Sequence, residues 1–311
     1  MTTHFEELMT FLSGSITPFH AVEVMAKTLQ GAGFEQLDQF DAVRMTPGKG
    51  YFVVHQGSSL MALRAGQSGV EAGLRLVGAH TDSPNLSVKP NPVKGRDGCI
   101  QLGVDVYGGA LLNPWFDRDL GMAGRVTLLT ADNTLLTTLF DTARAVAVIP
   151  SLAIHLDREA NSQRSINPQK DVVPLAMLGE HQQYDLKTWL AEELARTDSQ
   201  WQGARVMDYE LSLYDTQPPN QIGIDGDFIA SARLDNLLSC FAGMRALIDA
   251  DDAEWSLFVA TDHEEVGSAS TVGAQGPMLM DALAALAPDP TLNRMMRAQS
   301  WTISVDNAQA T

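Results

Sequence analysis

The sequence predicts an α/β protein, in which a discontinuous α/β domain is interrupted by an inserted β-rich domain. Three observations support this class. Helix-like and strand-like patterns fill residues 1–92, short β-like runs dominate residues 93–229, and strand-to-helix alternation returns in residues 230–311. We therefore expect residues 1–92 and 230–311 to form one domain, and residues 93–229 to form the other.

The opening segment is expected to begin with two helices. The first is indicated by four apolar side chains at helical spacing: Phe5, Leu8, Phe11 and Leu12. The second is expected to start at Thr17-Pro18, a cap residue followed by proline in the first turn, and to end at Gly31. Strands are then predicted in three apolar runs: Tyr51–Val54, Ser59–Arg64 and Leu74–Ala79.

The remaining elements follow two breaks in the pattern. Lys89-Pro90-Asn91-Pro92 and Gly95–Gly98 interrupt the strands, as a crossing between domains would. In the middle segment we expect a helix at Gln182–Thr197 and β-like runs at Ile100–Tyr107, Arg125–Leu129, Ala143–Ile149 and Val206–Tyr214. After the turn at Gln217-Pro218-Pro219-Asn220, we expect helices at Asn236–Asp249 and Met278–Leu286, and strands at Trp255–Ala260 and Trp301–Val305.

Composition and charge exclude several classes of function. Apolar residues make up 45% of the chain and charged residues 19%, as in ordinary globular proteins, and no apolar run is long enough to span a bilayer. The N-terminus lacks the basic and apolar regions of a signal peptide. A net charge of −17 argues against nucleic acid and membranes as partners. Cys99 and Cys240 lack CxxC spacing, so we expect two core thiols in a reducing cytoplasm.

Side chains that can bind a metal ion follow three of the predicted strands. They are His80-Thr81-Asp82 after the first, Asp262-His263-Glu264-Glu265 after the second, and Asp306 after the third. Ligands in an open α/β sheet collect beyond the carboxyl ends of the strands, so these groups are expected to share one site. The pattern indicates a metallohydrolase.

His80 and Asp82 can face the same point, because residues two apart in an extended chain project to one side. The imidazole could bind a metal while the carboxylate orients the ring and fixes its tautomer. His-x-Asp is also common by chance. The small and rigid residues on either side, Gly78-Ala79 and Ser83-Pro84, favour a site at a strand end.

Glu264 and Glu265 would diverge in an extended backbone, so that one could bind metal while the other takes a proton from metal-bound water. Paired glutamates are otherwise typical of a solvated helix face. Their position between an apolar strand and Val266-Gly267-Ser268 argues against that alternative. The sequence is not HExxH, which excludes a helix-borne zinc protease site.

Asp235 and Asp306 each have an ordinary alternative role. Asp235 stands just before a predicted helix, where it could simply cap the helix, or bridge two metal ions. Asp306 could be a turn residue. One histidine with several carboxylates favours zinc, cobalt or manganese. We find no Walker loop, no GxGxxG at a helix start and no nucleophile elbow, which argues against phosphate, dinucleotide and serine-hydrolase chemistry.

Taken together, four ordered motifs resemble the aspartyl aminopeptidases, a family of di-metal exopeptidases that includes vacuolar aminopeptidase I. The motifs are Val77-Gly78-Ala79-His80-Thr81-Asp82-Ser83-Pro84, Pro114-Trp115-Phe116-Asp117-Arg118-Asp119-Leu120, Arg233-Leu234-Asp235-Asn236 and Asp262-His263-Glu264-Glu265-Val266-Gly267-Ser268. The resemblance runs from Thr17-Pro18-Phe19-His20 to Ser304-Val305-Asp306-Asn307-Ala308.

The resemblance implies a role for each candidate residue. His80, Asp235 and Asp306 would hold one metal ion, and Asp235 would bridge to a second ion that Glu265 also binds. Two further residues would be catalytic: Asp82, which orients the first site, and Glu264, the general base.

The resemblance also implies partners. The inserted domain is similar to the family's dimerisation domain, and Ile154-His155-Leu156 matches a segment whose histidine reaches a neighbouring subunit's active site. From the sequence alone, His155 is an ordinary loop or strand histidine. The family builds tetrahedral dodecamers from such dimers, so self-association is expected along with peptide substrates.

Two departures from the family concern the end of the chain. Family members continue well beyond residue 311, and that region supplies another histidine for the second metal and much of the substrate pocket. Where the family usually has histidine, this chain has Gln309. We therefore expect the second metal site to be weakened.

Three hypotheses of function follow from the sequence. The first is a metal-dependent aminopeptidase that removes N-terminal residues, with the acidic preference that the family implies. The second is a catalytically incomplete homologue that acts only as an oligomerising protein. The third is a di-metal amide hydrolase that acts on acylated small molecules through the same ligands.

Overall fold

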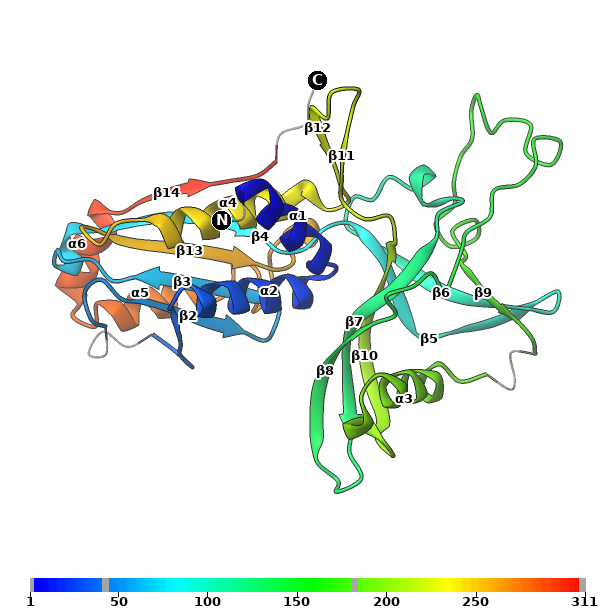
Figure 1. Cartoon of the computed structure of the whole chain (residues 1–311), viewed down its shortest axis with the longest axis horizontal. Helices are drawn as coiled ribbons and strands as arrows, with labels where there is room; N and C mark the ends of the chain where they lie inside the picture. Colours follow the sequence, from blue (N-terminus) through cyan, green and yellow to red (C-terminus); the bar gives the residue numbers. More distant parts are fainter. Residues whose placement is uncertain (1–2, 41–44, 181–183, 308–311) are drawn as a thin grey trace. The chain divides into compact units, whose positions relative to one another are not determined.

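The computed structural model describes residues 3–40, 45–180 and 184–307. The chain divides into two compact units, one of residues 1–83 and 219–311 and the other of residues 84–218 (Figure 1). The predicted α/β class, with a β-rich segment inserted into a discontinuous α/β unit, is confirmed. The sequence placed the boundaries later, at 92/93 and 229/230, and the roles assigned to the two parts stay predictions.

The first unit is built on a six-stranded sheet. Its strands in spatial order are β1 (Glu35–Gln36), β2 (Gly50–His55), β3 (Ser59–Arg64), β13 (Trp255–Thr261), β4 (Leu74–His80) and β14 (Trp301–Ser304). β4 lies between β13 and β14 and runs parallel to both. The carboxyl ends of these three strands therefore meet at one edge of the sheet.

Helices cover both faces of this sheet (Figure 1). The helices α1 (His4–Gly14), α2 (Pro18–Gly31) and α4 (Leu234–Asp249) pack on one face, and α5 (Met278–Leu286) and α6 (Pro290–Gln299) on the other. Successive side chains of each strand point to opposite faces of the sheet, so the strands contribute to the core on both sides. Phe258 of β13 packs with the first group of helices, and Leu257 and Val259 pack with the second.

The second unit is a six-stranded antiparallel sheet with one helix. Its strands in spatial order are β8 (Leu135–Asp141), β7 (Leu120–Leu129), β10 (Arg205–Asp215), β5 (Asn85–Arg96), β6 (Cys99–Tyr107) and β9 (Leu175–Leu178). The helix α3 (Leu186–Thr197) packs on this sheet through three buried leucines: Leu186, Leu190 and Leu194. A short hairpin, β11 (Asn220–Ile222) with β12 (Phe228–Ala230), follows in the chain and belongs to the first unit.

Several predicted elements differ from the observed ones. The proline segment, expected to mark a crossing between domains, is instead a bulge within β5, where the register shifts between Val88 and Val93. Ala143–Ile149 forms isolated bridges and no continuous strand. The predicted helix at 182–197 begins at Leu186, and its first two positions lie outside the described residues. Among the described helices, none has the length and apolar character needed to cross a membrane.

α6 was not predicted, although a helix-start signal is present. Asp289 accepts hydrogen bonds from the backbone N–H groups of Thr291 and Leu292, and Pro290 occupies the first turn. The helix buries Met296 completely, but most of its other side chains are exposed or half-buried. The helix is polar on average and buries a single apolar side chain, which explains why the apolar pattern did not reveal it.

α4 approaches the sheet closely at Gly243. A Cβ atom on Gly243 would lie 2.7 Å from Cε2 of Phe258 and 3.1 Å from Cγ1 of Val77. Both neighbours belong to sheet strands, and Phe258 is fully buried. The absence of a side chain at this position therefore sets how closely the helix that begins at Leu234 packs against β13 and β4.

We expect Gly243→Ala to lower the free energy of unfolding of the first unit by about 1–3 kcal/mol, because the new methyl group overlaps Phe258. Helix propensity alone would favour alanine by about 1 kcal/mol. Gly31→Ala is the matched control, since a Cβ there meets no atom within 4 Å. In urea denaturation, the unfolding midpoint of Gly243→Ala should be lower than that of wild type, and the midpoint of Gly31→Ala should not. An unchanged midpoint for Gly243→Ala would contradict the close packing.

Candidate metal centre

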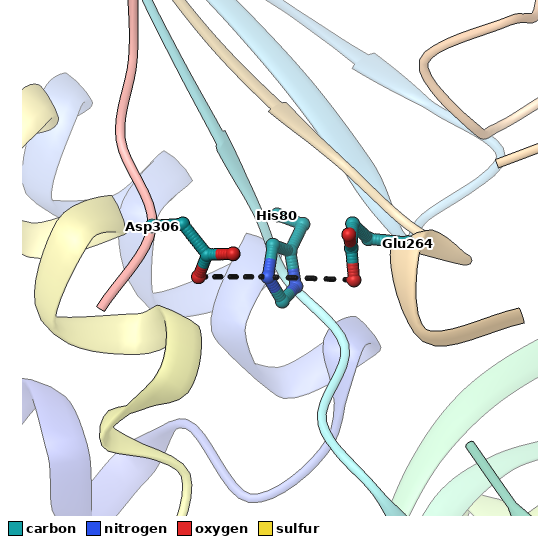
Figure 2. Close-up of side chains that lie close together, drawn as sticks. All are labelled: His80, Glu264 and Asp306. Atoms are coloured by element: carbon teal, nitrogen blue, oxygen red, sulfur yellow. Dashed lines mark ion pairs between the residues drawn. The ribbon is translucent and has the colours of Figure 1, made fainter. Parts of the chain in front are cut away.

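The three predicted clusters meet at the carboxyl edge of the first unit's sheet. His80 is the last residue of β4, Glu264 lies in the turn after β13, and Asp306 follows β14. One possible ligand atom from each of these three side chains lies within 4.8 Å of the other two. Figure 2 shows the imidazole of His80 between the carboxylates of Asp306 and Glu264. The predicted convergence of these residues is therefore observed.

The geometry centres on Nε2 of His80. The nearest carboxylate oxygen is Oδ1 of Asp235 at 3.3 Å, followed by Oδ1 of Asp306 at 3.6 Å and Oε2 of Glu264 at 3.8 Å. The His80 side chain is 6% exposed, whereas the side chains of Asp235 and Asp306 are 53% and 62% exposed. A buried nitrogen thus faces a group of oxygens that solvent can reach.

Asp82 lies behind the histidine and is fully buried. Its Oδ1 is 3.3 Å from Nδ1 of His80, and the backbone oxygen of Asp82 is 3.1 Å from the same nitrogen. The two carboxylate oxygens also accept hydrogen bonds from the backbone N–H groups of Glu264 and Glu265, each at 3.1 Å. Asp82 therefore both orients the imidazole and holds the turn that carries the two glutamates.

Asp235 reaches the site from the first turn of α4. The dihedral angles of Asp235 and Asn236 are not helical, so the regular helix begins after them, one residue later than the predicted start at Asn236. The hydroxyl of Ser83 donates a 2.7 Å hydrogen bond to the backbone oxygen of Asp235. Oδ1 of Asp235 lies 3.3 Å from Nε2 of His80, which favours a role in the site over that of an ordinary cap.

The two glutamates lie in a short 3₁₀ turn, Glu264–Val266, and not in extended backbone. His263 just before the turn has a φ of 63°. Glu264, and not Glu265, belongs to the group of ligand atoms around His80. Glu265 is half-buried beside the same charges. The division into a base at Glu264 and a ligand at Glu265 stays a prediction.

The charges in the site alter its protonation. Burial alone would lower the pKa of His80, but the hydrogen bond and charge of Asp82, with the charges of Glu264 and Asp235, raise it to about 9. Burial raises the pKa of Asp235, and the hydrogen bond and charge of Asp306 add to the effect. Burial and the charge of Asp82 raise the pKa of Glu265. Without a cation, the site therefore retains protons.

These residues fit a bound divalent cation. Nε2 of His80 is buried and has no hydrogen-bond partner among the described residues, which is costly unless another group satisfies it. Carboxylates that crowd together repel each other, and a cation between them removes the repulsion. Imidazole nitrogen with carboxylate oxygens is a donor set typical of zinc, cobalt or manganese.

A cavity of about 210 Å³ adjoins the centre. Its lining includes His80, Glu264 and Asp306, together with apolar side chains of the sheet and of α5. No lysine or arginine lines it. Within the described part of the chain, this cavity therefore provides no cation to pair with an acidic side chain.

His155 and Gln309 are not part of this cluster. His155 is an exposed residue of a turn in the second unit, and its proposed contact with a neighbouring subunit stays a prediction. Gln309 lies outside the described residues. Sequence analysis missed two buried side chains that contact the site's backbone, Asn236 and Cys240. Helical spacing placed both on α4, but no pattern indicated what they bind.

We expect Asp82→Asn to weaken binding of Zn²⁺ about 10–100-fold, because an amide cannot accept both backbone N–H bonds while orienting His80. Metal must displace the His80 proton, so wild-type affinity should rise with pH toward about 9. In Asp82→Asn the pKa of His80 should be lower, so Zn²⁺ affinity should stop rising at a lower pH than in wild type. Titration with a competing chelator from pH 6 to 9 tests both effects. Asp105→Asn in the second unit is the control, and equal affinities in the two variants would contradict the role of Asp82.

Comparisons with known proteins agree with the motifs. The aminopeptidase I zinc metalloprotease family (M18) matches residues 11–311. A protein described as a probable M18 family aminopeptidase 2, from Pseudomonas entomophila strain L48, is 49% identical over 303 residues, which is 97% of this chain and 70% of that protein.

Solved structures show the same fold. The structure of the Ape4 and Nbr1 complex contains a chain that is 32% identical, with a TM-score of 0.90 over 98% of this chain and 63% of that one. The mApe1 dodecamer of Saccharomyces cerevisiae is 25% identical, with a TM-score of 0.81 over 98% of this chain and 72% of that one. The present chain thus spans between about three fifths and three quarters of these relatives. The resemblance inferred from the four motifs is confirmed: the chain belongs to the aminopeptidase I family of zinc metalloproteases (M18), which are hydrolases.

Proposed function

We propose that this chain carries the catalytic centre of a metal-dependent aminopeptidase that removes N-terminal residues from peptides. Family membership supports the reaction class. The single observation that carries the proposal is the group of carboxylates around Nε2 of His80, which is buried and has no hydrogen-bond partner among the described residues. Residues this distant in sequence have no structural need to meet at one buried nitrogen.

The proposed ligands of the first metal ion are His80, Asp235 and Asp306, and Asp235 would bridge to a second ion at Glu265. When bound, two divalent ions would polarise the carbonyl of the first peptide bond and lower the pKa of a water molecule. Zinc is proposed because the family is described as zinc metalloproteases, with cobalt and manganese as alternatives.

Glu264 is proposed to move the proton. Its side chain is 48% exposed, so substrate and water can reach the carboxylate. The carboxylate would accept a proton from the attacking water and pass it to the leaving amine nitrogen. Asp82 supports this step by binding the backbone N–H of Glu264, which fixes where the side chain begins. Proton transfer and metal binding therefore depend on the same buried carboxylate.

A preference for acidic N-terminal residues is proposed from the resemblance alone. The cavity beside the centre has no lysine or arginine in its lining. Chromogenic aspartyl, glutamyl and leucyl amides would reveal any preference. N-acetylated versions of the same amides would separate an aminopeptidase, which needs a free amine, from a hydrolase of acylated small molecules.

We expect Glu264→Gln to reduce kcat at least 100-fold with little change in Zn²⁺ affinity, because general-base catalysis contributes about 10²–10⁴-fold. Glu265→Gln should instead weaken the binding of a second ion and leave the first ion in place. Aminoacyl-amide turnover and metal stoichiometry should be measured in both variants of the metal-loaded chain. Unchanged turnover in Glu264→Gln would contradict the role of Glu264 as general base. Weaker binding of the first ion in this variant would instead identify Glu264 as a metal ligand.

A second candidate function is self-association through the inserted segment, residues 93–229, with or without turnover. One relative of known structure is a dodecamer. The segment around His155 exposes three apolar side chains, Leu152, Ile154 and Leu156, at 60%, 56% and 65%. Apolar side chains that gather in an exposed turn are typical of an interface. We therefore propose that this turn contacts another copy of the chain.

We expect native mass spectrometry to show dimers or larger assemblies of the wild-type chain and mainly monomers of Ile154→Asp, because a buried charge opposes association. Leu178→Asp is the control, since Leu178 is 81% exposed elsewhere in the same unit. A monomeric wild-type chain, or equal behaviour of the two variants, would contradict self-association through this turn.

The compartment is proposed to be the reducing cytoplasm. Cys99 and Cys240 are both free thiols in the structure. Free cysteines that persist without a disulfide are typical of reducing compartments. Localisation of a tagged chain in the producing cell would test this proposal.

A further inference from the structure

The start of α4 contains two fully buried polar side chains that bind backbone groups of the neighbouring strands. Asn236 and Cys240 are both 0% exposed. Neither is a candidate metal ligand, and each donates a hydrogen bond to a backbone carbonyl outside its own helix. A buried donor is retained at little cost only where it satisfies an acceptor.

Cys240 satisfies the carbonyl at the end of β4. Its thiol donates a 3.0 Å hydrogen bond to the backbone oxygen of His80. Burial raises the pKa of Cys240, and the charge of Asp82 adds to the effect, so the thiol keeps the proton that it donates. The backbone of His80 is thereby fixed to α4, while Asp82 fixes its ring.

Asn236 makes the corresponding contact at the end of β14. Its Nδ2 donates a 2.8 Å hydrogen bond to the backbone oxygen of Val305, the residue before Asp306. The N–H of Val305 in turn donates to the oxygen of Gly78 in β4 at 2.9 Å. The segment that carries Asp306 is therefore fixed between β4 and α4.

We propose that Asn236 and Cys240 are positioning residues of the metal centre: together they tie the backbones of His80 and Asp306 to the helix that carries Asp235. This inference deepens the proposed function and rests on it. The positions of all three proposed ligands of the first metal ion would then be set by contacts with one helix, α4. Contacts behind metal ligands typically change metal affinity by 10–100-fold, so the loss of either hydrogen bond should be measurable.

The test compares variants that remove a donor with one that retains it. Cys240→Ala removes the donor and leaves the His80 carbonyl buried, whereas Cys240→Ser keeps an O–H donor at the same position. Asn236→Ala removes the bond to Val305. Leu247→Ala is the control for lost stability, because Leu247 is a 4% exposed core residue of the same helix and its side chain has no hydrogen-bond donor.

Zn²⁺ affinity, the visible spectrum of the Co²⁺-loaded chain and thermal stability should be measured for each variant. We expect Cys240→Ala and Asn236→Ala to bind Zn²⁺ at least tenfold more weakly, with an altered Co²⁺ spectrum. Cys240→Ser should stay within about threefold of wild type. Leu247→Ala should lose thermal stability but keep both metal properties. Equal affinities of Cys240→Ala and wild type, or of Cys240→Ser and Cys240→Ala, would overturn the proposal.

A measurement without metal separates this inference from the proposed function. In hydrogen–deuterium exchange of the metal-free chain, Cys240→Ala should speed exchange around residues 76–82 and Asn236→Ala around residues 301–307. Leu247→Ala should not speed exchange specifically in these two segments. If wild type bound no metal, the proposed function would fail, and the exchange pattern would still decide whether the two side chains hold these backbones. Unchanged exchange in both segments would overturn the proposal.

Discussion

The buried carboxylate of Asp82 is the contact on which the candidate centre depends. It binds the ring of His80 on one side and two consecutive backbone N–H groups, those of Glu264 and Glu265, on the other. Charge-assisted hydrogen bonds of this kind are stronger than neutral ones and hold their partners at fixed positions. One side chain thus joins the end of β4 to the turn after β13, and sets the distance between the histidine and both glutamates.

The surrounding fold makes this contact possible. β4 runs parallel to both neighbours, so the chain leaves β13, β4 and β14 at one edge with their next residues side by side. α4 then packs closely over these strands at Gly243, and its first turn brings Asp235 to 3.3 Å from His80. The core and the site are therefore not independent: a change that lifts α4 from the sheet also moves a carboxylate away from the imidazole.

The sequence predicted the shared site because its signal is local. Each candidate residue follows an apolar strand, and the rule that strand ends collect ligands applies without knowledge of strand order. The order of the sheet, the 3₁₀ turn at Glu264 and the release of Asp235 from a capping role depend on tertiary contacts. The contacts of Asn236 and Cys240 could not be predicted for the same reason, since the sequence places both on a helix but does not show which carbonyl each meets.

Two elements, β8 and α6, were not predicted because they lack a strong apolar pattern. β8 exposes Leu135 and Leu136 and has no clear alternation, while α6 depends on its capping residues. The prolines in β5 misled the prediction because Tyr209 donates hydrogen bonds to the carbonyls of Lys89 and Pro90, which stabilises a bulge where the sequence suggests a break.

The most direct test of the central claim is a crystal structure of the zinc-soaked chain with anomalous data at the zinc absorption edge. We predict an anomalous peak about 2.0–2.2 Å from Nε2 of His80 and from carboxylate oxygens of Asp235 and Asp306. A peak bound elsewhere, or none at this edge of the sheet at saturating zinc, would contradict it.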